Sequence, residues 1–183
     1  MSALRSTPDD WTDITDDQQR RGPRIQPRPA AEPAPTFFEL DDAQCHAILD
    51  RNRVGRIAYS FHDRVDIAPV HFVRRGPWLY GRSAPGSKLT TLAHVPWVAF
   101  EVDEIEGLFD WRSVVVHGAF YCLMPGGTSY DVSAWEAGLD ALRELVPGSF
   151  TRDDPVPFRL AMFRISVDQV TGRSARSGSL AGK

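Results

Sequence analysis

The chain has 183 residues, of which 42% are hydrophobic, 10% aromatic and 25% charged. This length and composition predict one sizeable domain with a genuine core and exclude wholesale disorder. The formal net charge of −3 argues against nucleic acid or an anionic membrane as the main partner. The two cysteines form no Cys-x-x-Cys pair, there is no run of about 20 apolar residues, and no secretion signal is recognised, so we expect a cytoplasmic protein.

The first 36 residues contain six of the fourteen prolines, with an acidic cluster followed by a basic one. Such a segment buries too little apolar surface to offset the entropy of ordering its backbone. We therefore predict a disordered, proline-rich tail over residues 1–36, either solvated or used as a docking segment. The folded domain is expected over residues 37–172. The end of the chain is rich in Gly, Ser and Arg, so we expect fraying from about Thr171 and a flexible C-terminus over residues 173–183.

The domain is predicted to begin with a helix and to continue mainly as strands. Asp41 or Asp42 is a good N-cap, and the helix should end near Asn52. A second helix is expected over residues 133–145, ended by a Pro-Gly pair. Short runs rich in β-branched and aromatic residues predict six strands between and after these helices: Val54–Tyr59, Val65–Val73, Trp78–Arg82, Val95–Val102, Ser113–Leu123 and Ala161–Val167.

The connections between the first three strands have the length of hairpin turns, which predicts antiparallel pairing. Several strands are apolar on both faces, for example residues 97–100 and 114–116. Both faces of such strands must be covered by protein. A closed barrel or a subunit interface would provide this cover.

Residues 83–93 combine a Pro-Gly turn with the start of a short helix, Gly86-Ser87-Lys88-Leu89. Free backbone N–H groups, the positive end of the helix dipole, a hydroxyl and an ammonium group would meet there, which is the geometry of an anion site. Lys88 and Arg82 would add charge-assisted hydrogen bonds to a phosphate. An ordinary capped surface helix with a solvated lysine fits the same residues, and the Walker phosphate-loop pattern is absent.

No other motif indicates catalysis or metal binding. The five histidines lack the spacing of metal ligands, and no nucleophile elbow is present. His71 and His117 lie in predicted strands, where they could line a pocket or be structural.

The order and spacing of the segments resemble the pyridoxamine 5'-phosphate oxidase-like family over about residues 38–170, with a nitroimidazole-reductase type as the most similar branch. The first helix and the following strand, Val54-Gly55-Arg56-Ile57-Ala58, begin the resemblance. The segments that carry the rest are Pro69-Val70-His71-Phe72-Val73, Trp78-Leu79-Tyr80, Gly86-Ser87-Lys88-Leu89, Val98-Ala99-Phe100-Glu101-Val102-Asp103 and Trp111-Arg112-Ser113-Val114-Val115-Val116-His117-Gly118.

This resemblance implies a mainly β fold, a six-stranded antiparallel split β-barrel with flanking helices. It also implies a homodimer that binds FMN in two clefts at the subunit interface. The chain would then be an FMN-dependent oxidoreductase that transfers a hydride or electrons to a small planar organic substrate. By resemblance, the phosphate is held by Ser87 and Lys88 with help from Arg82 and Ser83, and the flavin ring is approached by Ala68, Pro69, Val70, Trp111 and Ser113.

The sequence departs from the family pattern at two places. Gly81 stands where nitroimidazole-reductase relatives commonly have a histidine, so the resemblance does not by itself predict nitro-drug reduction. The C-terminal Arg-x-His pair that grips the substrate phosphate in the oxidase is missing, which disfavours vitamin B6 oxidation. A deazaflavin coenzyme in place of FMN, or a non-catalytic barrel that binds flavin, haem or a tetrapyrrole, remains an alternative.

Overall fold

The computed structural model describes residues 34–61 and 64–178. The predicted N-terminal tail lies outside this part except for its last three residues. The described elements, in chain order, are β1 (Thr36–Leu40), α1 (Asp42–Arg51), β2 (Val54–Phe61), β3 (Arg64–Arg75), β4 (Trp78–Ser83), α2 (Ser87–His94), β5 (Trp97–Gly107), β6 (Asp110–Leu123), α3 (Ser129–Leu145), β7 (Ala161–Ser166) and β8 (Gln169–Arg176).

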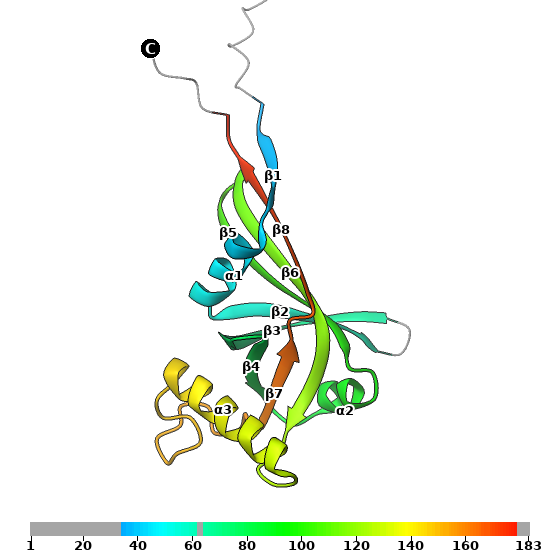
Figure 1. Cartoon of the computed structure of the whole chain (residues 1–183), viewed down its shortest axis with the longest axis vertical. Coiled ribbons are helices and arrows are strands. Elements are labelled where there is room, and N and C mark those ends of the chain that lie inside the picture. Colours follow the sequence, from blue (N-terminus) through cyan, green and yellow to red (C-terminus); the bar gives the residue numbers. More distant parts are fainter. Residues whose placement is uncertain (1–33, 62–63, 179–183) are drawn as a thin grey trace, which may run out of the picture. The chain divides into compact units, whose positions relative to one another are not determined.

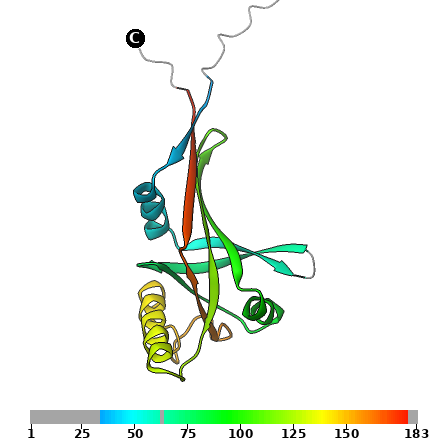
Figure 2. The same cartoon turned by 45° about the vertical axis from the view of Figure 1, so that its right-hand side comes forward.

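Six of the strands close into a ring, which confirms the predicted split barrel. The strands β6, β5, β2, β3, β4 and β7 pair in that order, every pair antiparallel, and β7 pairs again with β6. The outer strands β8 and β1 extend the sheet beyond β6, away from the ring (Figures 1 and 2). The hairpins β2–β3 and β3–β4 have the predicted antiparallel pairing.

The long strand β6 belongs to both the ring and the extension. Its first part, Trp111–His117, pairs with β8, whereas Phe120–Leu123 pairs with β7. Gly118 lies where the two partners exchange, and any Cβ there would overlap the carbonyl oxygen of Ser166. A glycine is therefore required at the point where the barrel splits.

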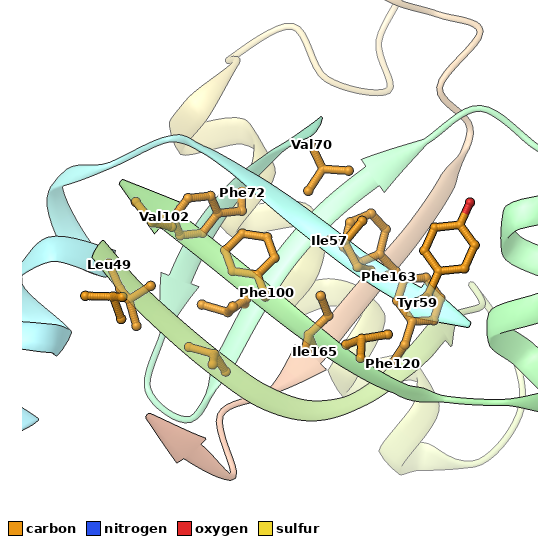
Figure 3. Packing of buried hydrophobic residues seen from close by; sticks show 14 of the residues in the cluster. Leu49, Ile57, Tyr59, Val70, Phe72, Phe100, Val102, Phe120, Phe163 and Ile165 are labelled. Carbon is orange, nitrogen blue, oxygen red and sulfur yellow. The ribbon is translucent and has the colours of Figure 1, made fainter. Parts of the chain in front are cut away.

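The core fills the ring and continues under α1. Phe72 contacts Phe100 edge-on, with 4.9 Å between ring centroids, and Phe120 stacks on Phe163 at 4.8 Å. Figure 3 shows these rings meeting inside the barrel with aliphatic side chains around them. Such aromatic pairs add about 0.5–1.5 kcal/mol each to the burial of their surface.

Both long helices begin at capping boxes. Asp41 and Gln44 cap α1 reciprocally, as the predicted N-cap requires, and α1 ends at Arg51 with Asn52 as its C-cap. The start predicted for α3 is wrong by four residues, because Thr128 and Asp131 form a second capping box upstream. One face of α3 packs on the outer side of β4 and β7 and forms a second, smaller core with Tyr80 and Met162.

The predicted flexible C-terminus is wrong for most of the described residues from 173 onward. Residues up to Arg176 form β8, between β1 and β6, and Ser177 bonds to Asp110. The small residues of this segment suit its position beside α1, because a Cβ at Gly172 would lie 2.6 Å from the Cys45 sulfur. No helix in the described part of the chain is long and apolar enough to cross a membrane.

Candidate functional site

The first part of the candidate site is an unpaired strand edge. β3 pairs with β2 from Arg64 to His71, but β4 meets β3 only from Phe72 onward. Within the described residues, the other edge of β3 is therefore unpaired over its first eight residues. Pro69 lies on this edge, and an edge or a bulge is where a strand accommodates a proline. The free backbone groups on this edge offer donors and acceptors to a ligand.

The start of α2 forms the second part. Gly86 is the N-cap residue and supplies no side-chain hydrogen bond, and its carbonyl accepts the N–H groups of Leu89 and Thr90. The first N–H groups of a helix have no acceptor within the helix, so those of Ser87 and Lys88 remain for other partners. A Cβ added at Gly86 would meet no heavy atom within 4 Å. The space on the side of Gly86 where a Cβ would project is therefore open.

Lys88 brings a cation to this open space. Burial lowers the pKa of the half-buried Lys88 ammonium group, and the neighbouring positive charge of Arg159 lowers it further, while Asp66 acts in the opposite direction. The Asp66 carboxylate is itself occupied, because it accepts the Tyr59 hydroxyl at 3.0 Å and the N–H of Ile67. The excess of positive charge suits an anion.

Arg159 and His71 extend the same region. Arg159 lies just before β7, and its guanidinium is 3.2 Å from Nδ1 of His71 at the end of the unpaired edge of β3. Sequence reasoning left His71 open and missed Arg159, Asp66 and Tyr59. The distinguishing feature of Arg159 in the sequence is a lone charge between Phe158 and Leu160, both of which are exposed.

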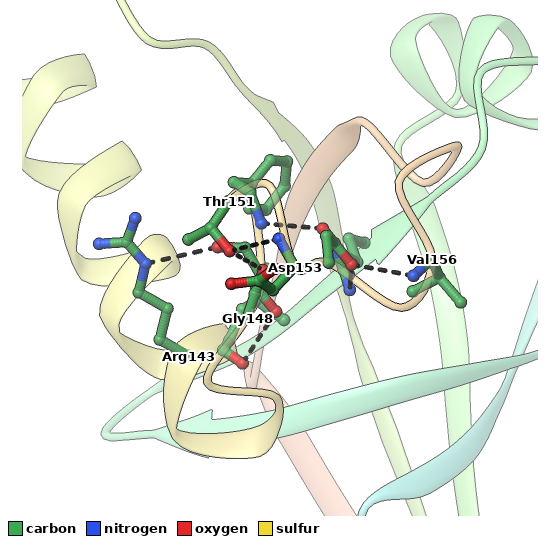
Figure 4. A network of polar contacts seen from close by, with 10 residues as sticks. Arg143, Gly148, Thr151, Asp153 and Val156 are labelled. Carbon is green, nitrogen blue, oxygen red and sulfur yellow. Dashed lines mark hydrogen bonds and ion pairs between the residues drawn. The ribbon is translucent and has the colours of Figure 1, made fainter.

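Arg82, which was predicted to bind the phosphate, instead forms a buried ion pair. Its guanidinium makes a two-pronged ion pair with the Asp154 carboxylate, at 2.5 and 2.9 Å, and both side chains are at least 95% buried. This pair holds the pKa of Asp154 far below its usual range. Asp154 also accepts the N–H groups of Phe150 and Val156, so the pair fixes the loop between α3 and β7 (Figure 4). Arg82 is committed to this loop.

The remaining predicted residues divide into two groups. Ala68, Pro69 and Val70 lie on β3, and Ser83, at the end of β4, leads into the loop before α2. Trp111 and Ser113 lie instead near the start of β6, beside β8. Phe120, which bonds to Pro96 just after α2, is about 30 Å further along that strand. One chain therefore does not bring Trp111 and Lys88 to the same small ligand.

The surroundings of Trp111 and Ser113 are a sheet face, not a barrel interior. The Ser113 hydroxyl donates to Glu101 at 3.1 Å, and Glu101 and Asp103 both pair with Arg56. Trp111 packs against Phe37 at 6.2 Å between ring centroids. A shallow cavity of about 320 Å³ lies over the two predicted residues and β8.

Comparison with known proteins places this arrangement among relatives. Residues 41–174 match the sequence model of a family described as pyridoxamine 5'-phosphate oxidase. An uncharacterised protein of Rhizobium meliloti is 27% identical over 145 residues, 75% of this chain and 94% of that protein. A crystal structure of an FAD-binding protein from Mesorhizobium loti is 26% identical with a TM-score of 0.61, covering 77% of this chain and 99% of that one. An FAD-binding protein from Mycobacterium smegmatis has the same fold at 23% identity, with a TM-score of 0.54 and coverage of 74% and 98%.

Proposed function

The chain belongs to the pyridoxamine 5'-phosphate oxidase family, and on this premise we propose that it is a flavin-dependent oxidoreductase that acts on a small planar organic substrate. The observation that carries the proposal is the half-buried Lys88, which shares the open end of α2 with Arg159 beside the unpaired edge of β3. A bound flavin supplies the redox chemistry. FMN is the flavin that the sequence predicts, and FAD is the one named for two structural relatives.

The phosphate end of the flavin fits the start of α2. The N–H groups and side chains of Ser87 and Lys88 would bind the phosphate oxygens, and Arg159 would add a second charge. Arg82 contributes indirectly, because its pair with Asp154 fixes the loop that leads to Arg159.

The ring end fits the edge of β3. The N–H of Phe72 bonds to Arg53 on the β2 side, so alternation along β3 turns the backbone groups of Ile67, Pro69 and His71 toward the free edge. These groups suit the polar edge of a flavin ring, and Pro69 offers a carbonyl there but no N–H. These residues would hold the ring flat and leave one of its faces to the substrate. Positioning of this kind requires no acid or base from the chain.

A homodimer would complete the site. The face of β3, β2, β5 and β6 that points away from the core carries Val65, Ile67, Trp97 and Ile105, each 61–74% exposed. A second copy packed on this face would bury these side chains. Trp111 and Ser113 of one chain would then reach the flavin held by Lys88 of the other.

The first experiment is the visible spectrum of the freshly purified protein, followed by denaturation and mass identification of the released ligand. Yellow protein that releases FMN or FAD supports the proposal and identifies the flavin. A deazaflavin mass would change the cofactor but keep the reaction class. Colourless protein that does not bind added FMN, FAD or deazaflavin would refute the proposal.

Subunit mixing tests the shared site. Lys88→Ala and Trp111→Ala chains each form dimers in which both sites are damaged, but a mixed dimer has one intact site and one site with both changes. Random exchange therefore restores about one site in four. Restored flavin binding after mixing supports sites shared between subunits, whereas no recovery would place both residues in the same chain's site or outside it.

Turnover separates the oxidoreductase from a non-catalytic flavin carrier. Reduction of the bound flavin by a nicotinamide or deazaflavin donor, followed by its reoxidation with a small planar organic acceptor, is expected. Position 81 is not available for a side chain that reaches the substrate, because a Cβ there would lie 2.4 Å from the Phe163 ring. Flavin that never cycles with any donor would favour the carrier.

A further inference from the structure

A second cationic centre lies on the other side of β7 from the barrel core. Strand β7 lies between β4 and β6. Its Phe163 and Ile165 side chains point into the core, and Arg164 between them points to the opposite face of the sheet. The Arg164 side chain is buried with only 6% of the residue surface exposed. It shares no residue with the flavin site proposed above.

The guanidinium of Arg164 is surrounded by aromatic rings and has no carboxylate partner in the described part of the chain. Its Cζ lies over the Trp78 ring, 3.9 Å from the ring centroid, and 5.6 Å from the centroid of the Tyr121 ring. One terminal nitrogen of Arg164 donates to the Tyr130 hydroxyl at 2.6 Å, but Nε has no hydrogen-bond partner. Among the described residues, this Nε is the one buried side-chain nitrogen or oxygen atom without a partner.

A cavity of about 370 Å³ opens beside this cation, between the end of β6 and the start of α3. Its walls include Tyr121, Tyr130 and Met124. Asp131 is the single carboxylate in the described lining, and it is exposed and accepts both the N–H and the hydroxyl of Thr128 in the capping box. The hydrogen bonds from Thr128 lower the pKa of the Asp131 carboxyl, and the charge of Arg164 helps to lower it, although no ion pair joins Arg164 to Asp131. The cavity therefore joins an aromatic wall to a buried cation that makes no direct ion pair within the described residues.

From this geometry we propose that the cavity is a binding site for a small aromatic carboxylate, separate from the flavin site. The N–H donors of a guanidinium lie in its own plane, where a planar carboxylate binds. A buried cation is stabilised when an anion joins it, and the cation–π contacts alone replace only part of its lost hydration. The ring of the ligand would lie against Tyr121 and Met124.

Titration of the flavin-loaded protein with benzoate by calorimetry tests the site, with benzyl alcohol as the uncharged comparator. Benzoate should bind and benzyl alcohol should not. Arg164→Met should weaken benzoate binding roughly tenfold to 150-fold. Arg75→Met is the matched control, because Arg75 pairs with Glu144 on the surface and should leave the affinity unchanged.

Met124→Glu provides a second test that does not alter the packed strand. Met124 is 65% exposed in the loop after β6, so the fold should tolerate glutamate, but the added negative charge should weaken benzoate binding. Equal binding of benzoate and benzyl alcohol, or no saturable benzoate binding up to about 10 mM, would overturn the proposal. Benzoate binding that neither variant weakens would also overturn it.

Discussion

Arg82 and Lys88 are six positions apart in the sequence, and both are predicted to bind the flavin phosphate, yet the fold gives them opposite environments. Arg82 is buried in a two-pronged pair with Asp154. Lys88 is half-buried beside another cation, Arg159, and its pKa is lowered. The Arg82–Asp154 pair stabilises a loop, whereas the repulsion between Lys88 and Arg159 would be relieved by an anionic ligand.

This contrast teaches that a basic residue near a phosphate-like motif is not sufficient evidence for a ligand contact. A paired, buried cation has its donors occupied and holds structure. A cation that lacks a free acidic partner carries a cost in the empty protein, and a ligand relieves it.

Removal of Arg82 should have the largest effect, and it should fall on stability. Arg82→Met leaves the Asp154 carboxylate buried without its cation, which should lower the melting temperature on the order of 10 °C. Asp154→Asn combined with Arg82→Met should recover part of the loss, because no buried charge remains. A normal melting temperature with greatly reduced flavin affinity would reverse the roles assigned here.

Removal of Lys88 should act on the ligand instead. Lys88→Ala is expected to weaken flavin binding roughly tenfold to 150-fold, through the loss of a charged partner of the phosphate. The melting temperature of the flavin-free protein should not fall. Fluorescence titration with FMN measures the affinity, and Arg75→Ala serves as the control for loss of one surface charge. Unchanged affinity in a folded Lys88→Ala protein would remove the phosphate assignment.

Acid should separate the two residues without mutation. The pKa of Asp154 is lowered in the folded state, so its contribution to stability is present above the usual aspartate pKa and is lost as the pH falls below about 4. Acid unfolding of the wild type should therefore be steeper than that of Arg82→Met, which lacks the pair. Chemical denaturation at pH 3, 5 and 7 measures this, and parallel pH profiles of the two proteins would contradict the expectation.

Alkali should have the smallest effect, with opposite signs for stability and binding. The lowered pKa of Lys88 means that the folded, flavin-free protein binds fewer protons than the unfolded chain below the usual lysine range, so this group makes stability rise with pH there. Flavin affinity should fall several-fold over the same interval, since the phosphate loses its cation, up to the limit set by Lys88→Ala. In Lys88→Arg the decrease should move to higher pH, and an identical decrease would implicate another group.

Local sequence patterns were enough to predict much of the fold. Asp41 and Gln44 cap α1 through neighbouring residues, and the six barrel strands follow from runs of β-branched and aromatic residues. Their resemblance to a known family in turn identified the split barrel and the segment of Ser87 and Lys88. The caps and the strands depend on residues close together in the chain, and the resemblance depends on the order of segments along it, so one sequence was enough for both.

The amino-acid sequence alone predicted the positions of the barrel strands along the chain, the family and the phosphate-like turn before α2. The strand formed by Gly172 and its neighbours became evident from the three-dimensional packing, because close contact with Cys45, not β-propensity, favours small residues there. The same packing brings Arg82 to Asp154, 72 positions away, and Lys88 to Arg159. Residues so distant in the chain come into contact only when the ring of strands closes, so local residue preferences do not predict these contacts.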